Sequence, residues 1–188
     1  RMLKNVKRQF PKWRELSPLL KFTPPQLPSR KKRLSKALTI WDLRAIAKRR
    51  TPKGPFDYTD GAAESEVTLE RARRAYLDLE FRPNILIDVK NVSLECEVLG
   101  EKFAMPMGMA PTGFTRMMHS EGENAVARAA QKFGIPYTLS TLGTTTIEDV
   151  VSAAPDGTNW FQLYMWKDRD ASMQLVERAK KAGVKNLL

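Results

Sequence analysis

Short apolar runs alternate with helical patterns through the second half of the chain. Strands are expected at residues 105–110, 137–141 and 160–165, and a fourth begins at 186–188. Helices are expected between them at 123–133, from 146 toward 154, and at 170–182. Strands that alternate with helices of about ten residues predict right-handed βαβ units and a parallel sheet.

Capping residues mark the ends of these helices. Ser120 with Glu123 indicates a capping box, in which the Glu side chain returns to the backbone of the Ser. Thr146 with Asp149 opens the next helix in the same way. Gly134 and Gly183 follow the last helical residues and predict left-handed helix ends.

Helices and a hairpin are predicted before the first of these strands. Thr39 and Asp42 cap a helix that ends before Thr51-Pro52, and a second helical pattern covers residues 67–79. Apolar and polar residues then alternate from 92 to 98, and a turn around Gly100 leads to Phe103. This period of two around a glycine turn predicts a β-hairpin.

Two architectures fit a parallel sheet of this kind. A doubly wound sheet usually carries a glycine-rich phosphate turn after its first strand. Here Pro111-Thr112-Gly113 follows that strand, with no G-x-G-x-x-G pattern. The prediction is therefore α/β: the N-terminal portion of a (β/α)₈ TIM barrel, about three and a half βα units, preceded by helices, the hairpin and a basic arm. Such barrels need about 250 residues, so we expect the rest to follow Leu188.

The positive charge of the chain is confined to its N-terminal arm. The formal net charge is +11, and residues 1–36 hold twelve Lys and Arg against the single acid Glu15. Residues 37–188, the expected N-terminal half of the incomplete barrel, are therefore neutral. A neutral body excludes the patterned basic surface of a nucleic-acid-binding domain. Five prolines exclude one long helix in the arm.

The arm also contains apolar residues, among them Phe10, Trp13 and Phe22. Basic and apolar residues together suit an anionic membrane surface, which would place the protein peripherally on the cytoplasmic side of a membrane or in the cytoplasm. A solvated tail and an arm packed on a neighbouring subunit remain open alternatives. No run approaches the roughly 18 to 20 apolar residues of a spanning helix. Cys96, the only cysteine, excludes an internal disulfide and a cysteine-based zinc site.

Candidate chemistry lies where the predicted strands end, because barrel sites are built at the C-terminal ends of the strands. Those ends are residues 110–113, 140–141 and 162–164. They supply backbone groups, hydroxyls, an amide and a phenol, with no carboxylate pair and no metal-ligand cluster. The set suits a polar, planar, neutral ring better than a metal or a phosphate. Helix caps and a packed tyrosine are the alternative interpretations of the same residues.

Five segments, in order, resemble the FMN-dependent 2-hydroxy-acid dehydrogenases, a family that includes glycolate oxidase, the flavocytochrome lactate dehydrogenases and the quinone-linked L-lactate dehydrogenases. They are Phe-Asp-Tyr-Thr-Asp-Gly-Ala-Ala-Glu (56–64), Met-Ala-Pro-Thr-Gly (109–113), Thr-Leu-Ser-Thr (138–141), Phe-Gln-Leu-Tyr (161–164) and Lys-Asp-Arg (167–169). The resemblance runs from about residue 37 to 188. It implies a TIM barrel that binds FMN.

The resemblance assigns a cofactor role to five residues. Pro111, Thr112 and Gly113 would line the flavin ring through backbone groups, and Ser140 and Gln162 would hydrogen-bond its polar edge. The family usually has Ala where this chain has Gly113, and the smaller residue leaves more room beside the flavin. This difference bears on reactivity with oxygen.

The resemblance also assigns substrate contacts. Tyr58 would bind the substrate carboxylate, and Tyr164 would act as a catalytic residue that steadies the substrate as charge develops. The family's base, arginine, flavin-facing lysine and phosphate-binding residues would all follow Leu188, so residues 1–188 alone are expected to be inactive. The lone histidine, His119, does not match the base and is expected to be a structural or surface residue.

The implied reaction is oxidation of an L-2-hydroxy acid to a 2-oxo acid, with hydride passing to FMN. L-Lactate and a quinone acceptor are favoured, because residues 112–116 and the basic arm resemble the quinone-linked lactate enzymes. An oxidase that releases hydrogen peroxide is the first alternative. A non-catalytic half-barrel interaction module is the second, and an intact-mass measurement would test it. The family's habit of forming homo-oligomers leaves the oligomeric state open.

Overall fold

The computed structural model describes residues 12–17 and 29–188, in two compact units, 1–46 and 47–188. The first unit holds α1 (Trp13–Leu16), α2 (Arg30–Leu34) and most of α3 (Ile40–Lys48). Ser29 caps α2 by accepting a hydrogen bond from the backbone N–H of Lys32. The apolar arm residue Phe10 lies outside the described residues, and the boundary at residue 36 stays a prediction.

The capping box predicted at the start of α3 is confirmed. The backbone N–H of Asp42 donates to Thr39 Oγ1 over 3.3 Å, and Asp42 Oδ2 accepts from the backbone N–H of Thr39 over 2.9 Å. These bonds satisfy donors that a helix start would otherwise leave unpaired. They also hold the pKa of the Asp42 carboxyl below its usual value, with the Thr39 backbone bond as the largest cause.

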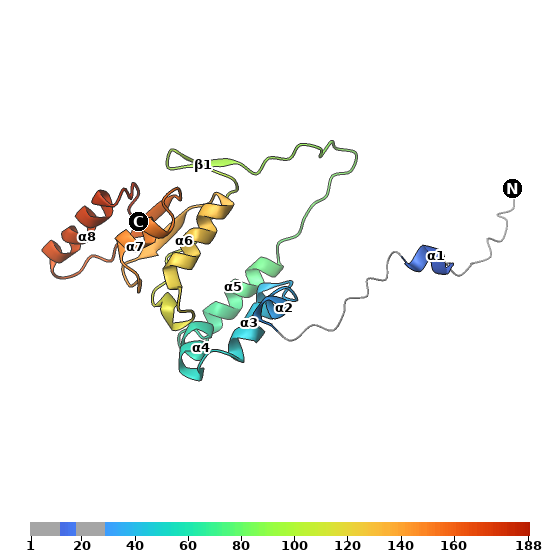
Figure 1. Ribbon diagram of the computed structural model, residues 1–188, viewed down its shortest axis with the longest axis horizontal. Helices are drawn as coiled ribbons and strands as arrows, with labels where there is room; N and C mark the ends of the chain where they lie inside the picture. Colours follow the sequence, from blue (N-terminus) through green and yellow to red (C-terminus); the bar gives the residue numbers. More distant parts are fainter. Residues whose placement is uncertain (1–11, 18–28) are drawn as a thin grey trace. The chain divides into compact units, whose positions relative to one another are not determined.

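The second unit opens with α4 (Lys53–Asp60) and α5 (Val67–Leu77), followed by a long run without regular structure (Figure 1, green). The strand predicted from Val92 begins only at Cys96: β1 (Cys96–Val98) pairs antiparallel with β2 (Glu101–Phe103). Val92 and Leu94 have no paired residues, since the pairing of β1 with β2 stops at Cys96 and Phe103. A strand persists only where a partner supplies the ladder of hydrogen bonds. The hairpin itself is confirmed.

The remaining elements alternate as the sequence predicts. They are the 3₁₀ turn η2 (Thr115–Met117), α6 (Gly122–Phe133), β3 (Tyr137–Ser140), α7 (Ile147–Ala153), β4 (Asn159–Gln162) and α8 (Arg169–Lys181). β3 and β4 are parallel, with Leu139 opposite Phe161 and Ser140 opposite Gln162. α6 packs on β3 and on α7, and α7 packs on α8 (Figure 1).

Two further strands are reduced to single bridges. Met109 bridges Tyr137 on one side of the pair, and Leu187 bridges Phe161 on the other, both parallel. The first strand, predicted over 105–110, is short because Pro106 lacks a backbone N–H and the N–H of Met107 turns back to the carbonyl of Met105. Two bonds remain: Met109 donates to the Pro136 carbonyl, and Thr138 donates to that of Met109.

The order of the four segments across the sheet equals their order in the chain. Met109, β3, β4 and Leu187 follow one another, each added on the same side of the last. A doubly wound sheet reverses direction at a switch point, whereas a barrel sheet does not. This singly wound α/β order agrees with the barrel prediction, although the described residues form an open sheet and do not close a barrel.

The hairpin lies against the N-terminal end of the sheet. Trp160, at the start of β4, donates through Nε1 to Glu101 Oε2 over 3.0 Å and meets the ring of Phe103 edge-on, with 5.9 Å between the ring centroids. Asn186 Nδ2 donates to the same Glu101 oxygen over 2.9 Å. The opposite, C-terminal end of the sheet is therefore the end that remains available for a site. None of the helices in the described part of the chain has the length and apolar character to cross a bilayer.

Candidate functional site

The two sides of the β3–β4 pair have different chemistry. Leu139 and Phe161 are buried in the apolar core beneath the helices. Successive side chains of a strand point to opposite faces, so Ser140 and Gln162 lie on the other face. We call the face of Leu139 and Phe161 the helix-facing side and the other face, with Thr138, Ser140, Trp160 and Gln162, the open side.

Ser140 and Gln162 meet at the C-terminal end of the open side. Ser140 Oγ donates to Gln162 Oε1 over 3.3 Å, and the backbone N–H of Thr141 donates to the same oxygen over 3.4 Å. Both bonds need an oxygen acceptor, which leaves the amide nitrogen of Gln162 as a donor. The structure thus joins two of the predicted cofactor residues.

The predicted residue Gly113 lies against the loop that follows β3. A Cβ at Gly113 would approach Leu142 Cβ to 3.1 Å, and the backbone N–H of Phe114 donates to the Leu142 carbonyl over 3.0 Å. Leu142 in turn donates its N–H to Ser140 Oγ over 3.1 Å. Pro111 and Thr112 precede Gly113 directly, so the loop that follows Met109 reaches the same edge of the sheet as Ser140.

The two predicted substrate residues are exposed. The backbone N–H of Tyr164 donates to Thr141 Oγ1 over 2.9 Å, which fixes the main chain beside the Ser140–Gln162 pair, while its side chain is 57% exposed. Tyr58 lies on α4 and its side chain is 68% exposed. We call Gly113, Ser140, Thr141 and Gln162 the strand-end cluster. Its hydrogen bonds include the backbone of Tyr164 and do not include Tyr58.

Glu123 is a buried carboxylate that the sequence interpretation assigned wrongly. It forms no capping box with Ser120; Glu121 is the N-cap of α6 and has no side-chain cap bond. Instead Glu123 is fully buried and accepts from the backbone N–H of Thr144 over 2.7 Å, from Thr144 Oγ1 over 2.8 and 2.9 Å, and from Thr145 Oγ1 over 2.7 Å. The run of three threonines, 144–146, could have revealed these hydrogen bonds to Glu123. One hydroxyl suffices to cap α7, which leaves two hydroxyls for another acceptor.

The ionisation of Glu123 is set by two opposing causes. Burial disfavours the charged form and raises the pKa, but the hydrogen bonds from the Thr144 backbone and from the Thr145 and Thr144 hydroxyls outweigh it and lower the pKa to about 2. Glu123 is therefore a carboxylate at neutral pH. Burial, and then the charge of Glu123, raise the pKa of the Tyr137 phenol, which stays protonated.

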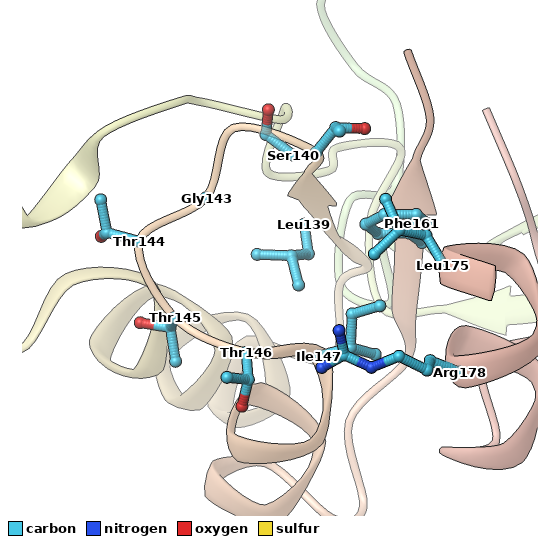
Figure 2. A pocket seen from close by; sticks show the side chains of 11 residues that line it. Leu139, Ser140, Gly143, Thr144, Thr145, Thr146, Ile147, Phe161, Leu175 and Arg178 are labelled. Carbon is cyan, nitrogen blue, oxygen red and sulfur yellow. The ribbon is translucent and has the colours of Figure 1, made fainter. Parts of the chain in front are cut away.

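A cavity of about 240 Å³ opens beneath the loop after β3. Figure 2 shows Leu139 pointing into the space that the loop from Gly143 to Ile147 surrounds, with Phe161 and Leu175 beside it, whereas Ser140 points away. The Arg178 guanidinium at its rim is held by Glu148, over 2.8 and 3.0 Å. The cavity therefore lies on the helix-facing side; Ser140 borders it, with its side chain directed away, and Gln162 does not line it.

The comparisons with known proteins identify the family. Residues 47–188 match the family model described as FMN-dependent dehydrogenase. The chain belongs to the FMN-dependent dehydrogenase family. It is 56% identical, over 97% of its length, to a Mycobacterium tuberculosis protein named "Putative L-lactate dehydrogenase", and 47% identical, over 75% of its length, to the glycolate oxidase of Spinacia oleracea. It spans 44% and 38% of those relatives, less than half of either.

Solved structures of this family share the fold. A mandelate oxidase matches with a TM-score of 0.76 and 35% identity, over 81% of this chain and 44% of that one. A chimera of (S)-mandelate dehydrogenase matches with a TM-score of 0.74 and 38% identity, over 79% of this chain and 41% of that one. A further mandelate oxidase structure holds a C4a-OH-FMN adduct. The cofactor of the family is FMN, as the sequence resemblance implied.

The residues at the strand ends fit the ring of this cofactor. The polar edge of an isoalloxazine carries neutral carbonyl, N–H and ring-nitrogen groups, and the open side offers a hydroxyl at Ser140 and an amide at Gln162 with a donor to spare. Gly113 keeps the neighbouring loop free of a side chain. No group of His, Cys, Asp and Glu in the described ranges could hold a metal ion. The donor set therefore suits a flavin edge.

Proposed function

We propose that the protein oxidises an L-2-hydroxy acid, foremost L-lactate, to the corresponding 2-oxo acid with FMN, and that a quinone or a similar acceptor takes the electrons. The observation that carries this proposal is the coincidence of the family match with the strand-end cluster, since residues 47–188 contain Gly113, Ser140 and Gln162 at one edge of the sheet. Lactate is favoured by the name of the Mycobacterium tuberculosis relative.

Each residue has a defined task in this proposal. Bound FMN supplies the acceptor for two electrons and a proton. Ser140 and the amide of Gln162 orient the polar edge of the ring. Tyr164 stabilises the charge that develops on the substrate oxygen, and Tyr58 binds the substrate carboxylate.

The proposal is tested by steady-state kinetics of the full-length, FMN-loaded enzyme with an artificial dye as acceptor. L-Lactate, glycolate, L-mandelate and D-lactate are compared. We expect the highest kcat/KM for L-lactate and no turnover of D-lactate. Preference for glycolate or mandelate would retain the reaction class and overturn the substrate, and lack of turnover with all four acids would overturn the reaction class.

An oxidase that reduces oxygen to hydrogen peroxide is the second candidate. It is favoured by the glycolate oxidases and mandelate oxidases among the similar proteins. Oxygen uptake measured beside reduction of a quinone analogue separates the two functions. Gly113→Ala sharpens the test, because the added Cβ would lie 3.1 Å from Leu142 Cβ, a tight contact that shifts the loop beside the predicted ring position. A change in the ratio of the two rates would show that this space governs access of the acceptor.

The basic arm, residues 1–36, is proposed to bind an anionic membrane surface. Within its described part, α2 carries four consecutive basic residues, 30–33. Each Lys or Arg near such a surface adds on the order of 1 kcal/mol. Sedimentation with anionic and with neutral vesicles, at low and high salt, tests this proposal. Vesicle binding that is unchanged when residues 1–36 are deleted would contradict it.

A further inference from the structure

Glu123 is an unusual residue to bury. Removing a carboxylate from water is costly unless every lone pair finds a donor. Besides its own backbone N–H, Glu123 finds its donors in the loop after β3: the backbone N–H and the hydroxyl of Thr144, and the hydroxyl of Thr145. A charge in the first turn of α6 is thus tied to a loop more than twenty residues away in the chain.

The Thr144 hydroxyl extends this connection to a third segment. It donates to Glu123 and accepts from the backbone N–H of Arg116 over 3.2 Å. We call residues 111–116 the first loop and residues 141–146 the second loop. The two loops are joined at two points, by Arg116 to Thr144 and by Phe114 to the Leu142 carbonyl. Only the first of these points rests on Glu123.

Both loops carry predicted flavin contacts. The first loop contains Gly113, which is packed on Leu142. The second loop is fixed to Ser140 by two bonds, from Leu142 N–H to Ser140 Oγ over 3.1 Å and from Gly143 N–H to the Ser140 carbonyl over 2.9 Å. The Thr144 hydroxyl is therefore one of two links between the segment that contains Gly113 and the segment that is fixed to Ser140.

We propose that Glu123 is a positioning residue that, through the Thr144 hydroxyl, sets the spacing of the two loops that hold the flavin ring. This inference rests on the proposed function in one respect, namely that FMN occupies the strand ends. It assigns Glu123 no contact with the cofactor or the substrate. The effect on FMN is transmitted through the hydrogen bonds that link Glu123 to Thr144 and Thr144 to Arg116.

Thr144 and Thr145 form a matched pair for the test. Each hydroxyl donates to Glu123, but only Thr144 also accepts from Arg116. Val has nearly the shape of Thr without the hydroxyl. Thr144→Val and Thr145→Val therefore remove comparable support from Glu123, and only Thr144→Val breaks the link to the first loop. Thr144→Ser keeps that link.

The measurements are the FMN dissociation constant, the visible flavin absorbance spectrum and the midpoint of thermal unfolding. We expect Thr144→Val to weaken FMN binding and to shift the flavin spectrum. The loss of affinity should be roughly tenfold, the lower end of the range for residues that orient the direct ligands of a bound group. Thr145→Val should bind FMN within about twofold of the wild type at a similar unfolding midpoint, and Thr144→Ser should restore the wild-type spectrum.

Two results would overturn the inference. One is equal FMN affinity and identical spectra for Thr144→Val and Thr145→Val. The other is a loss of affinity that follows the unfolding midpoint alone across the variants, with no recovery in Thr144→Ser. Failure of the wild-type protein to bind FMN would instead overturn the proposed function, so the two failures are distinguishable. Glu123→Gln adds a check, since it should reproduce the spectral shift of Thr144→Val.

Discussion

Leu139 and Ser140 are neighbours in β3, yet they meet opposite environments. Leu139 is packed among apolar side chains beneath the helices, whereas Ser140 is held by hydrogen bonds to Gln162 and Leu142 on the open side. One face of the strand pair thus contributes to folding stability and the other carries the predicted chemistry. This division lets substitutions on the two faces be distinguished by what they change.

The largest expected effect is on the helix-facing side. Leu139→Ala removes a side chain that is 3% exposed and should lower the free energy of unfolding by about 2–5 kcal/mol. Met173→Ala on α8, where the side chain is 49% exposed, is the control and should change it by less than about 0.5 kcal/mol. Denaturant titration measures both. A free energy of unfolding that is unchanged in Leu139→Ala would contradict the assignment of folding stability to this face.

The second expected effect is a dependence of stability on pH. The pKa of Glu123, about 2 in the fold, lies below its ordinary value of 4.5. The carboxylate therefore stabilises the fold above about pH 4.5, and this stabilisation, roughly 3 kcal/mol, is lost as the pH falls toward 2. Denaturant titrations across this range should show the loss.

Glu123→Gln should remove that pH dependence. Glu148→Gln is the control, because the pKa of Glu148 is also lowered, by its bond to Arg178, but the pair is about half exposed and should contribute little. A wild-type pH profile that persists in Glu123→Gln would show that other groups cause it.

The third expected effect concerns the open side. Tyr164→Phe should lower kcat for L-lactate on the order of a hundredfold, because the phenol stabilises charge that develops only in the transition state. FMN affinity and the unfolding midpoint should stay unchanged, since the Tyr164 side chain is exposed and its backbone bond to Thr141 remains. Loss of FMN from this variant would show that Tyr164 contacts the cofactor rather than the substrate.

The smallest expected effect is at Tyr58. A hydrogen bond to the substrate carboxylate acts in the ground state as well as the transition state, so Tyr58→Phe should raise KM about tenfold with little change in kcat. Tyr76→Phe, an exposed phenol on α5, is the control and should leave both constants unchanged. Unchanged kinetics in Tyr58→Phe would show that Tyr58 does not bind the substrate.

The sequence predicts best where the deciding partners are close in the chain. The Thr39–Asp42 box, the Thr146 cap and the left-handed Gly134 each depend on residues within four positions, and the structure confirms them. The alternation of strands and helices is confirmed for the same reason, because it follows from local periodicity.

The errors arise where a partner is distant. Glu123 fits the local pattern of a capping box with Ser120, but three donors from Thr144 and Thr145 outcompete a single backbone N–H. Val92 has the alternation of a strand but no facing strand. In both cases the outcome depends on contacts that local periodicity does not contain.

The central claim is that the strand ends hold an FMN that accepts electrons from an L-2-hydroxy acid. Its most direct test is an anaerobic titration of the full-length, FMN-loaded enzyme, monitored by the visible absorbance of the flavin. The account predicts that L-lactate bleaches this absorbance in proportion to the bound FMN and that D-lactate does not. A flavin that stays oxidised with L-lactate, glycolate and mandelate alike would contradict it.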